Sequence, residues 1–257
     1  MSDDPSPQNL NSRLEYKQNF DASSYLREFY SKYDNDPAMH VVLTLLPNVV
    51  RRLPVGGRLL DVGSGPTVHV AMCFRKTAQN IYLSDYSDDS RKELFHWLLS
   101  YRYWPAEKFD WSSITKFIAE REGESDKWDR IENETRKKIK GILPCNVLKP
   151  HVIPIKNKKF DIVTTFFCLE AACNTVQEYR TAVKNVTSLI EPGGNFVMGG
   201  LLQQSWYKTG GKCYKCLYLT EEILIDVLKQ CDILIENRKD FFYYDHQGIF
   251  LCVGCKK

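Results

Sequence analysis

The sequence predicts an α/β fold with a mostly parallel sheet, helices on both faces and an antiparallel hairpin at the C-terminus. From residue 58 onward, short apolar runs alternate with longer helical runs, which is typical of parallel strands joined by crossover helices. After residue 232 the order changes, because two strand-like runs follow each other with only the turn DHQG (245–248) between them.

The segment before this alternation is predicted to be helical. Residues 1–12 are polar with two prolines, so we expect a disordered tail there. One helix is expected over 20–33 with Asp21 or a following serine as its N-cap. A second is expected over 37–53, and its Pro47 should kink or divide it. We expect residues 13–257 to form a single domain, in which 13–55 is a helical cap region.

The remaining elements follow from the alternation and give a sheet of seven strands. Strands are expected at 58–62, 80–84, 141–147, 160–167, 195–201, 233–244 and 249–255. Helical runs are expected at 67–77, 88–101, 110–140 with interruptions, 176–190 and 220–231. The sequence EPGG (191–194) predicts a helix stop and a turn.

Composition and charge argue against several classes of protein. The net charge of +3 is too small to indicate a nucleic-acid partner. The polar N-terminus and the lack of an apolar run of 18 residues argue against secretion or a membrane partner. The nine cysteines are an odd number and several lie in apolar segments, so we expect free thiols and a cytoplasmic location. We also expect a monomer.

Two CxxC pairs, 213/216 and 252/255, raise the alternative of a zinc site. They are separated by 35 residues, which is longer than the usual ribbon spacing. Cys252 and Cys255 also lie in a predicted strand, where their side chains would face opposite ways. We expect no metal.

A glycine turn after the first strand is the first candidate site. The sequence RLLDVGSGPT places Asp61 at the strand end and Gly63 and Gly65 in the turn. Glycine permits positive φ and a close approach of ligand, and the following helix directs N–H groups at an anionic group. Asp85 ends the next strand, where a carboxylate holds a ribose diol, and Tyr86 offers an aromatic face. A helix N-cap is the alternative role for Asp85.

The departure from a dinucleotide motif indicates which ligand the turn takes. A dinucleotide fingerprint has Gly or Ala where this chain has Val68. We therefore expect an adenosyl group with an amino-acid carboxylate and no pyrophosphate, namely S-adenosylmethionine. The C-terminal hairpin agrees, since methyltransferase sheets usually end in this way. A redox enzyme that uses a nicotinamide dinucleotide is the alternative.

The methyl acceptor is expected at the carboxyl end of strand 160–167. Glu170 follows that strand among apolar residues, which disfavours an ionised carboxylate unless a cation such as a substrate amine pairs with it. Its alternative role is to cap the following turn. Residues 200–216 interleave amides, aromatics and glycines, which suits a lid over a small aromatic ligand or simply a surface hairpin. Asp245 lies in DHQG, where Asp is also a common turn residue.

These motifs resemble the family of phenylethanolamine, nicotinamide and indolethylamine (thioether) N-methyltransferases. DVGSGPT, SDYSD, FDWS, FCLEAAC, EPGG and QSWY occur in the family's order over residues 16–257. The resemblance implies a Rossmann-like class I methyltransferase fold, with S-adenosylmethionine converted to S-adenosylhomocysteine. With the residues above, the predicted cofactor-binding set is Tyr25, Tyr30, Asp61, Gly63, Ser64, Gly65, Thr67, His69, Asp85, Tyr86, Ser90, Asn146, Val147 and Phe166.

The acceptor side separates the branches of this family. Gly200 and Cys216 replace an Asp and a Ser that the nicotinamide enzymes carry, whereas LEAAC, SWY and DHQG resemble the phenylethanolamine branch. The resemblance implies that Glu170 and Asp245 are the catalytic carboxylates that position the amine and help remove its proton. The predicted substrate contacts are Phe20, Tyr30, Glu170, Gln204, Tyr207 and Asp245.

We therefore expect an N-methyltransferase of small arylalkylamines. A nicotinamide or indolethylamine N-methyltransferase, and a scaffold that binds the cofactor without catalysis, are the alternatives.

Overall fold

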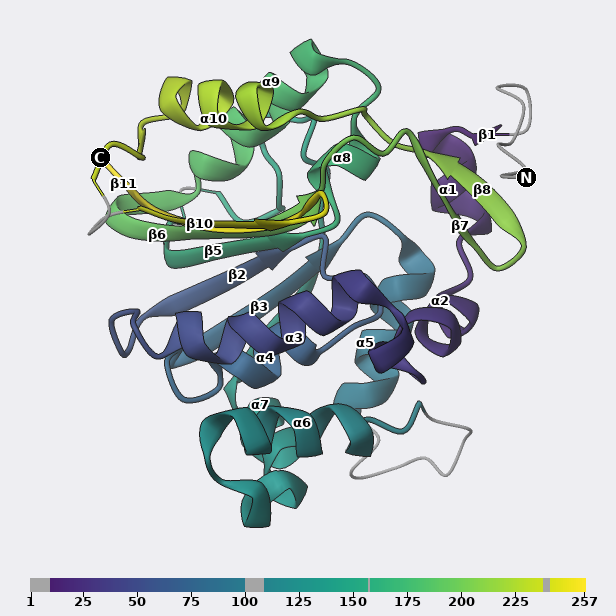
Figure 1. The fold of residues 1–257 in the computed structure, drawn as a ribbon, viewed down its shortest axis with the longest axis vertical. Helices are drawn as coiled ribbons and strands as arrows, with labels where there is room; N and C mark the ends of the chain where they lie inside the picture. Colours follow the sequence, from purple (N-terminus) through teal and green to yellow (C-terminus); the bar gives the residue numbers. More distant parts are fainter. Residues whose placement is uncertain (1–9, 100–108, 157, 238–240) are drawn as a thin grey trace.

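A twisted sheet forms the centre of the computed structural model, which describes residues 10–99, 109–156, 158–237 and 241–257 (Figure 1). The strand order is β10-β11-β6-β5-β2-β3-β4, and β9 pairs with β11. These strands are β2 (Arg58–Val62), β3 (Asn80–Asp85), β4 (Ile139–Pro144), β5 (Phe160–Phe166), β6 (Ile190–Leu201), β9 (Ile233–Leu234), β10 (Phe241–His246) and β11 (Ile249–Lys256). Neighbouring strands are parallel from β6 through β5, β2 and β3 to β4. Strand β11 is antiparallel to its neighbours β6, β9 and β10. This arrangement confirms the predicted α/β fold.

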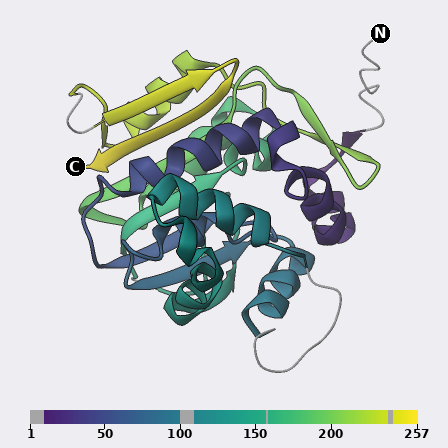
Figure 2. The same cartoon turned by 60° about the horizontal axis from the view of Figure 1, so that its bottom comes forward.

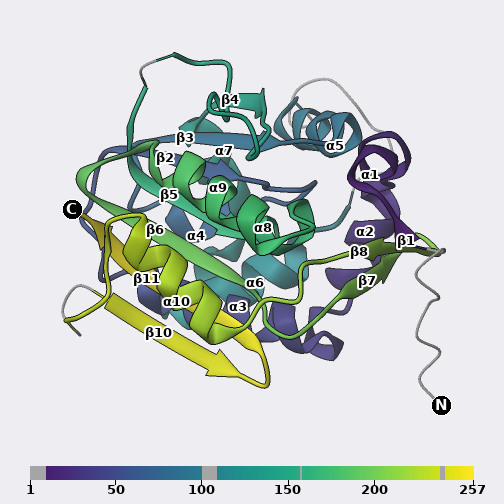
Figure 3. The same ribbon diagram turned by 90° about the horizontal axis from the view of Figure 1, so that it is seen from above.

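Helices cover both faces of the sheet. On one face lie α3 (Pro37–Val50), α4 (His69–Phe74), α6 (Ser112–Glu122) and α7 (Ile131–Lys138), and α6 and α7 come forward in Figure 2. On the other face lie α8 (Leu169–Ala172), α9 (Val176–Thr187) and α10 (Glu221–Gln230), as Figure 3 shows. Helix α5 (Asp88–Leu99) follows β3, and η3 (Ser125–Arg130) joins α6 to α7.

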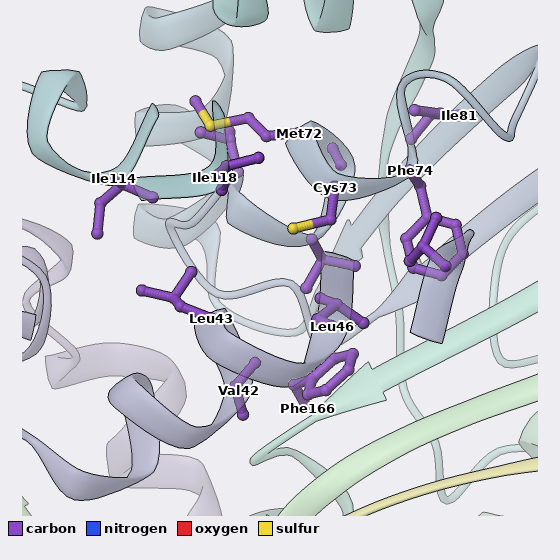
Figure 4. Packing of buried hydrophobic residues seen from close by; sticks show 14 of the residues in the cluster. Val42, Leu43, Leu46, Met72, Cys73, Phe74, Ile81, Ile114, Ile118 and Phe166 are labelled. Carbon is purple, nitrogen blue, oxygen red and sulfur yellow. The ribbon is translucent and has the colours of Figure 1, made fainter. Parts of the chain in front are cut away.

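The two faces bury separate apolar clusters because successive strand residues point to opposite sides. In β2, Leu59 packs with α3, α4 and α6, whereas Leu60 packs with α9 and α10. Figure 4 shows the first cluster, in which Leu43 and Leu46 of α3 face Cys73 of α4. In the described residues, no helix has the length and apolarity needed to span a bilayer.

A second, small sheet covers one end of the central sheet. It pairs β1 (Leu10–Asn11) in parallel with β8 (Lys212–Lys215), which forms a hairpin with β7 (Trp206–Thr209). Helices α1 (Arg13–Asn19) and α2 (Ala22–Phe29) and the turn η2 (Tyr33–Asn35) complete this cover, which lies at the right of Figures 1 and 3. The strand just before the expected N-terminal cap therefore shares a sheet with a segment about 200 residues later.

The N-terminal region differs from the prediction in three ways. Residues 1–9 lie outside the described residues, but disorder is wrong for 10–12, because β1 pairs with β8 and Ser12 forms a capping box with Glu15. Helix α1 was not predicted, whereas Asp21 does cap α2, as expected. Helix α3 continues through Pro47 to Val50, so the proline does not divide it.

Two strand predictions also need correction. EPGG does not separate the helix from the strand but lies inside β6, where the pairing with β5 jumps from Phe160↔Ile190 to Ile162↔Asn195. Gly193 has φ 77°, so these residues form a bulge that glycine permits. The single strand expected over 233–244 is two strands, β9 and β10, on either side of the residues that the structure does not describe.

Candidate active site

A cavity opens beyond the carboxyl ends of β2, β3, β4 and β5 and is closed from outside by α1, α2 and the β7–β8 hairpin. Most of the predicted site residues line it, and only Ser90 and Asp245 do not. The lining predicted residues are Phe20, Tyr25, Tyr30, Asp61, Gly63, Ser64, Gly65, Thr67, His69, Asp85, Tyr86, Asn146, Val147, Phe166, Glu170, Gln204 and Tyr207. The structure thus brings together segments that are far apart in the sequence.

The turn after β2 requires glycine for space as well as for conformation. Gly63 and Gly65 have φ of 72° and 59°. A Cβ atom on Gly63 would lie 2.2 Å from Sγ of Cys168, at the start of α8. The N–H groups of Gly63 and Ser64 donate to the Ser84 carbonyl at 2.8 and 2.9 Å, which fixes the turn against β3.

Asp85 is held in place by two backbone donors. Its Oδ2 accepts from Gly65 N and its Oδ1 from Ser87 N, both at 2.8 Å. Burial raises the pKa of this carboxyl, and the two donors oppose the increase. Asp85 is not the N-cap of α5, because Ser87 Oγ accepts from the N–H groups of Asp89 and Ser90. The remaining lone pairs of Asp85 are those that would accept a ribose diol.

Ser90 is a predicted cofactor residue that does not line the cavity. It is fully buried in the first turn of α5, and its N–H donates to Ser87 Oγ. Its place is therefore inside the helix packing and not on the cavity wall.

Two buried side chains near the turn carry unsatisfied polar atoms. Asp61 is 2% exposed; its Oδ1 accepts from Thr164 Oγ1 at 2.6 Å, but its Oδ2 has no partner, and burial raises its pKa to about 6. His69 lies between the rings of Tyr30 and Phe166, at 5.3 and 6.4 Å, and neither ring nitrogen has a partner. Burial lowers the pKa of His69 to about 3, so its ring is neutral.

These unsatisfied atoms fit the amino-acid part of S-adenosylmethionine. Leaving a buried polar atom without a partner costs about 1–3 kcal/mol, so each of these atoms favours a ligand with a complementary group. Asp61 Oδ2 can accept from the α-ammonium group, and a neutral imidazole keeps one N–H for the carboxylate.

The loop after β4 forms another wall of the cavity. Val147 is buried there, and Asn146 Oδ1 accepts from Leu148 N at 3.1 Å. This bond leaves a second lone pair on Asn146 for an exocyclic amine. Tyr86 is the neighbour on the β3 side, with Lys17 Nζ 5.2 Å from its ring centroid.

A further buried carboxylate lies in the cavity beyond the carboxyl end of β5. Glu170, at the start of α8, is 3% exposed. Its Oε1 accepts from Leu201 N at 3.1 Å, and its Oε2 has no partner. Burial raises the pKa of Glu170 to about 7. Phe167, with φ 51°, turns the chain between β5 and α8 and so places this side chain.

Aromatic rings line the same cavity. Phe20 packs on Tyr25 at 5.4 Å, and Tyr207 stacks on Tyr214 at 5.3 Å between centroids. Tyr16 joins the two pairs, at 4.7 Å from Phe20 and 5.5 Å from Tyr214. Tyr16 and Tyr214 were missed by the sequence analysis. Their signals are the i, i+4 spacing of Tyr16 with Phe20 and the cross-strand position of Tyr214 opposite Tyr207.

Asp245 does not line the cavity that holds Glu170, so the structure does not bring the predicted pair of catalytic carboxylates together. Asp245 is exposed at the end of the β10–β11 hairpin, and its Oδ1 accepts from Gly248 N at 2.9 Å. Gln247 and Gly248 have φ of 53° and 81°, as a tight hairpin turn needs. Asp245 acts as a turn residue, the simpler role considered for it. In the described part of the chain, no three His, Cys, Asp or Glu side chains are placed to hold a metal ion.

The chain is similar to three kinds of N-methyltransferase. It is 34% identical to a nicotinamide N-methyltransferase of Caenorhabditis elegans over 95% of this chain and 91% of that protein. It is 32% identical to an indolethylamine N-methyltransferase of Oryctolagus cuniculus, covering 81% and 80% of the two chains. A phenylethanolamine N-methyltransferase of Rattus norvegicus is 29% identical, with coverages of 89% and 81%.

Solved methyltransferase structures share the fold. A complex of DhpI with SAM and HEP has a TM-score of 0.57 at 14% identity, and the match covers 96% of this chain and 100% of that one. The N-methyltransferase NodS from Bradyrhizobium japonicum WM9, in complex with S-adenosyl-L-homocysteine, has a TM-score of 0.53 at 13% identity, with coverages of 95% and 96%. A family model described as the NNMT/PNMT/TEMT family matches residues 8–257. The chain therefore belongs to the NNMT/PNMT/TEMT family and is an S-adenosylmethionine-dependent methyltransferase.

Proposed function

We propose that this enzyme methylates the nitrogen of a small arylalkylamine, of the phenylethanolamine type. The observation that carries the proposal is the buried Glu170 carboxylate, whose Oε2 lacks a partner at the acceptor end of the cavity. A primary or secondary amine, bound as its cation, supplies the missing donor and charge. The rings that line the same cavity suit the aromatic part of the same molecule.

The cofactor side is assigned to residues that fit its parts. Asp61 and His69 would hold the amino-acid part, Asp85 and Tyr86 the ribose, and Asn146 the adenine. When bound, S-adenosylmethionine supplies an electrophilic methyl group on a sulfonium centre. The chain's task is then to hold the acceptor nitrogen in line and deprotonated.

Glu170 is the group that we assign to this proton. An arylalkylamine is mostly protonated at neutral pH, and an ammonium nitrogen has no lone pair with which to attack. A carboxylate with a pKa raised by burial to about 7 is a stronger base than an ordinary glutamate. Glu170 Oε2 accepts the ammonium N–H, and the proton passes to the carboxylate or through it to water.

The aromatic cover excludes water while this happens. Tyr16 lies in α1 and Phe20 is the C-cap residue of that helix. Tyr207 and Tyr214 come from the β7–β8 hairpin. The pairing of β1 with β8 joins the two halves of the cover. Cys73, Cys145 and Cys252 are buried thiols without disulfide partners, which supports a cytoplasmic location.

Nicotinamide is the second candidate acceptor. The 34% identity to the nicotinamide N-methyltransferase of Caenorhabditis elegans over 95% of this chain favours it. A pyridine nitrogen is neutral and needs no base, however, so it leaves the unpartnered carboxylate oxygen of Glu170 without a cation.

The test is methyl transfer from labelled S-adenosylmethionine to purified amines, with the product identified by mass. The panel is phenylethanolamine, octopamine, tryptamine, serotonin and nicotinamide. We expect turnover of arylalkylamines that is lost in Glu170→Gln and kept in the matched control Asp245→Asn. Turnover of nicotinamide alone contradicts the proposal, and donor binding without any transfer supports the scaffold alternative.

A further inference from the structure

Gly200 has a backbone conformation that other residues can adopt, but its surroundings leave no room for a side chain. It lies in β6 opposite Phe250 of β11. Unlike Gly63, it is not in the left-handed region of φ. A Cβ atom built on Gly200 would lie 2.6 Å from Oε1 of Glu170 and 3.0 Å from Cε1 of Phe250. No ordinary Cβ contact is that short, so one of these two neighbours would have to move.

The neighbour that moves is the carboxylate. Phe250 is fully buried between the strands and the helices above them, so its ring has no space to shift into. The Glu170 carboxylate ends a flexible side chain and lies against the open cavity. Its main chain is fixed, because Leu217 N donates to the Glu170 carbonyl at 2.8 Å. The displacement would therefore fall on the carboxylate and break its bond from Leu201 N.

We propose that Gly200 is a specificity-determining residue: its missing side chain allows the full-length Glu170 carboxylate to lie over β6 and select acceptors that bind as cations. This inference rests on the proposed function of Glu170. It predicts a length rule, in which a side chain at 200 is compatible only with a shorter acid at 170. Aspartate is shorter by one carbon–carbon bond of about 1.5 Å, which is enough to relieve the contact.

The kinetic test is a double-variant cycle between positions 170 and 200. We expect Gly200→Ala to raise KM for the best arylalkylamine about tenfold, as for the loss of a hydrogen bond to a charged group. Its affinity for S-adenosylmethionine should stay within about twofold, since the contact lies at the acceptor end. Glu170→Asp/Gly200→Ala should then exceed Gly200→Ala in kcat/KM. If the two losses simply multiply, Gly200 has only a packing role and the inference is wrong.

A stability measurement keeps the test independent of catalysis. Gly200→Ala should lower the Tm of the ligand-free protein less in a Glu170→Asp background than in the wild type, because the shorter acid removes the clash. Gly199→Ala is the matched control, since its Cβ would meet Phe166 at 2.7 Å on the opposite face and its cost should not depend on residue 170. Equal costs of Gly200→Ala in both backgrounds would falsify the inference.

The two proposals can fail separately. If the Tm values are coupled but the wild type methylates no arylalkylamine, the proposed function is wrong and the contact between positions 170 and 200 stands. If arylalkylamines are methylated but neither Tm nor kcat/KM is coupled, only the role of Gly200 is wrong.

Discussion

Replacing Glu170 by glutamine should abolish amine methylation and at the same time stabilise the ligand-free protein at alkaline pH. Burial raises the pKa of Glu170 from 4.5 to about 7. In that interval the native carboxyl keeps a proton that the unfolded chain has released, so wild-type stability falls as the pH rises through it. Above pH 7 the ionised native state carries the whole penalty.

The size of the effect follows from the same shift. At about 1.4 kcal/mol per pKa unit, a pKa of about 7 in place of 4.5 corresponds to about 3 kcal/mol. The carbonyl oxygen of the glutamine amide keeps the bond from Leu201 N. Its NH₂ group takes the position of the unpartnered Oε2 and stays without an acceptor, which reduces the stabilisation by about 1 kcal/mol. The net gain at pH 8 is about 2 kcal/mol, or a Tm higher by about 4–8 °C for a chain of this length.

Thermal unfolding of the ligand-free wild type and Glu170→Gln between pH 5 and pH 8 measures this effect. The difference in Tm should grow with pH in favour of the variant, while kcat/KM for an arylalkylamine falls at least a hundredfold. Asp245→Asn is the control, because that carboxylate is exposed and should change neither quantity. A difference in Tm that is the same at pH 5 and pH 8 would show that Glu170 is not a buried, titrating carboxylate.

Three further predictions concern the cavity walls. Asp85→Asn should weaken S-adenosylmethionine binding by an order of magnitude or more, measured by calorimetry, because a charged acceptor for the ribose diol is lost; unchanged affinity would remove Asp85 from the ribose site. Gly63→Ala should lower stability by at least about 2 kcal/mol in urea unfolding, because φ of 72° and a 2.2 Å approach to Cys168 Sγ act together, and a loss below 0.5 kcal/mol would contradict the tight turn. Tyr16→Ala should raise KM for the amine several-fold, more than it weakens donor binding, because Tyr16 packs on Phe20 and Tyr214, rings that we assign to the acceptor; a loss of donor affinity alone would contradict that assignment.

The cofactor half of the site could be predicted because its signals are local. Asp61, Gly63 and Gly65 follow one another at the end of β2, and Asp85 ends the adjacent strand, so the order of the parallel strands brings them together. The same reasoning placed Glu170 after β5.

The acceptor half could be predicted only in part, because it depends on contacts between distant segments. Tyr16 reaches the site because β1 pairs with β8. The sequence pattern of neither segment predicts a pairing across about 200 residues. The position of Asp245 outside the cavity could not be predicted for a different reason. The motif DHQG is compatible with both a turn and a binding loop, and the register of β10 with β11, which ends at His246↔Ile249, decides for the turn. The close approach of Gly200 to Glu170 could not be predicted either, because it depends on the distance between two segments and not on a sequence pattern.

The most direct test of the central claim compares kcat/KM for phenylethanolamine and nicotinamide in the wild type, Glu170→Gln and Asp245→Asn. If the buried Glu170 carboxylate selects a cationic amine, the wild type prefers phenylethanolamine, Glu170→Gln loses that preference at least a hundredfold, and Asp245→Asn matches the wild type. If Glu170→Gln methylates phenylethanolamine as well as the wild type does, or if Asp245→Asn is the variant that loses it, the assignment of the acceptor site to Glu170 is contradicted.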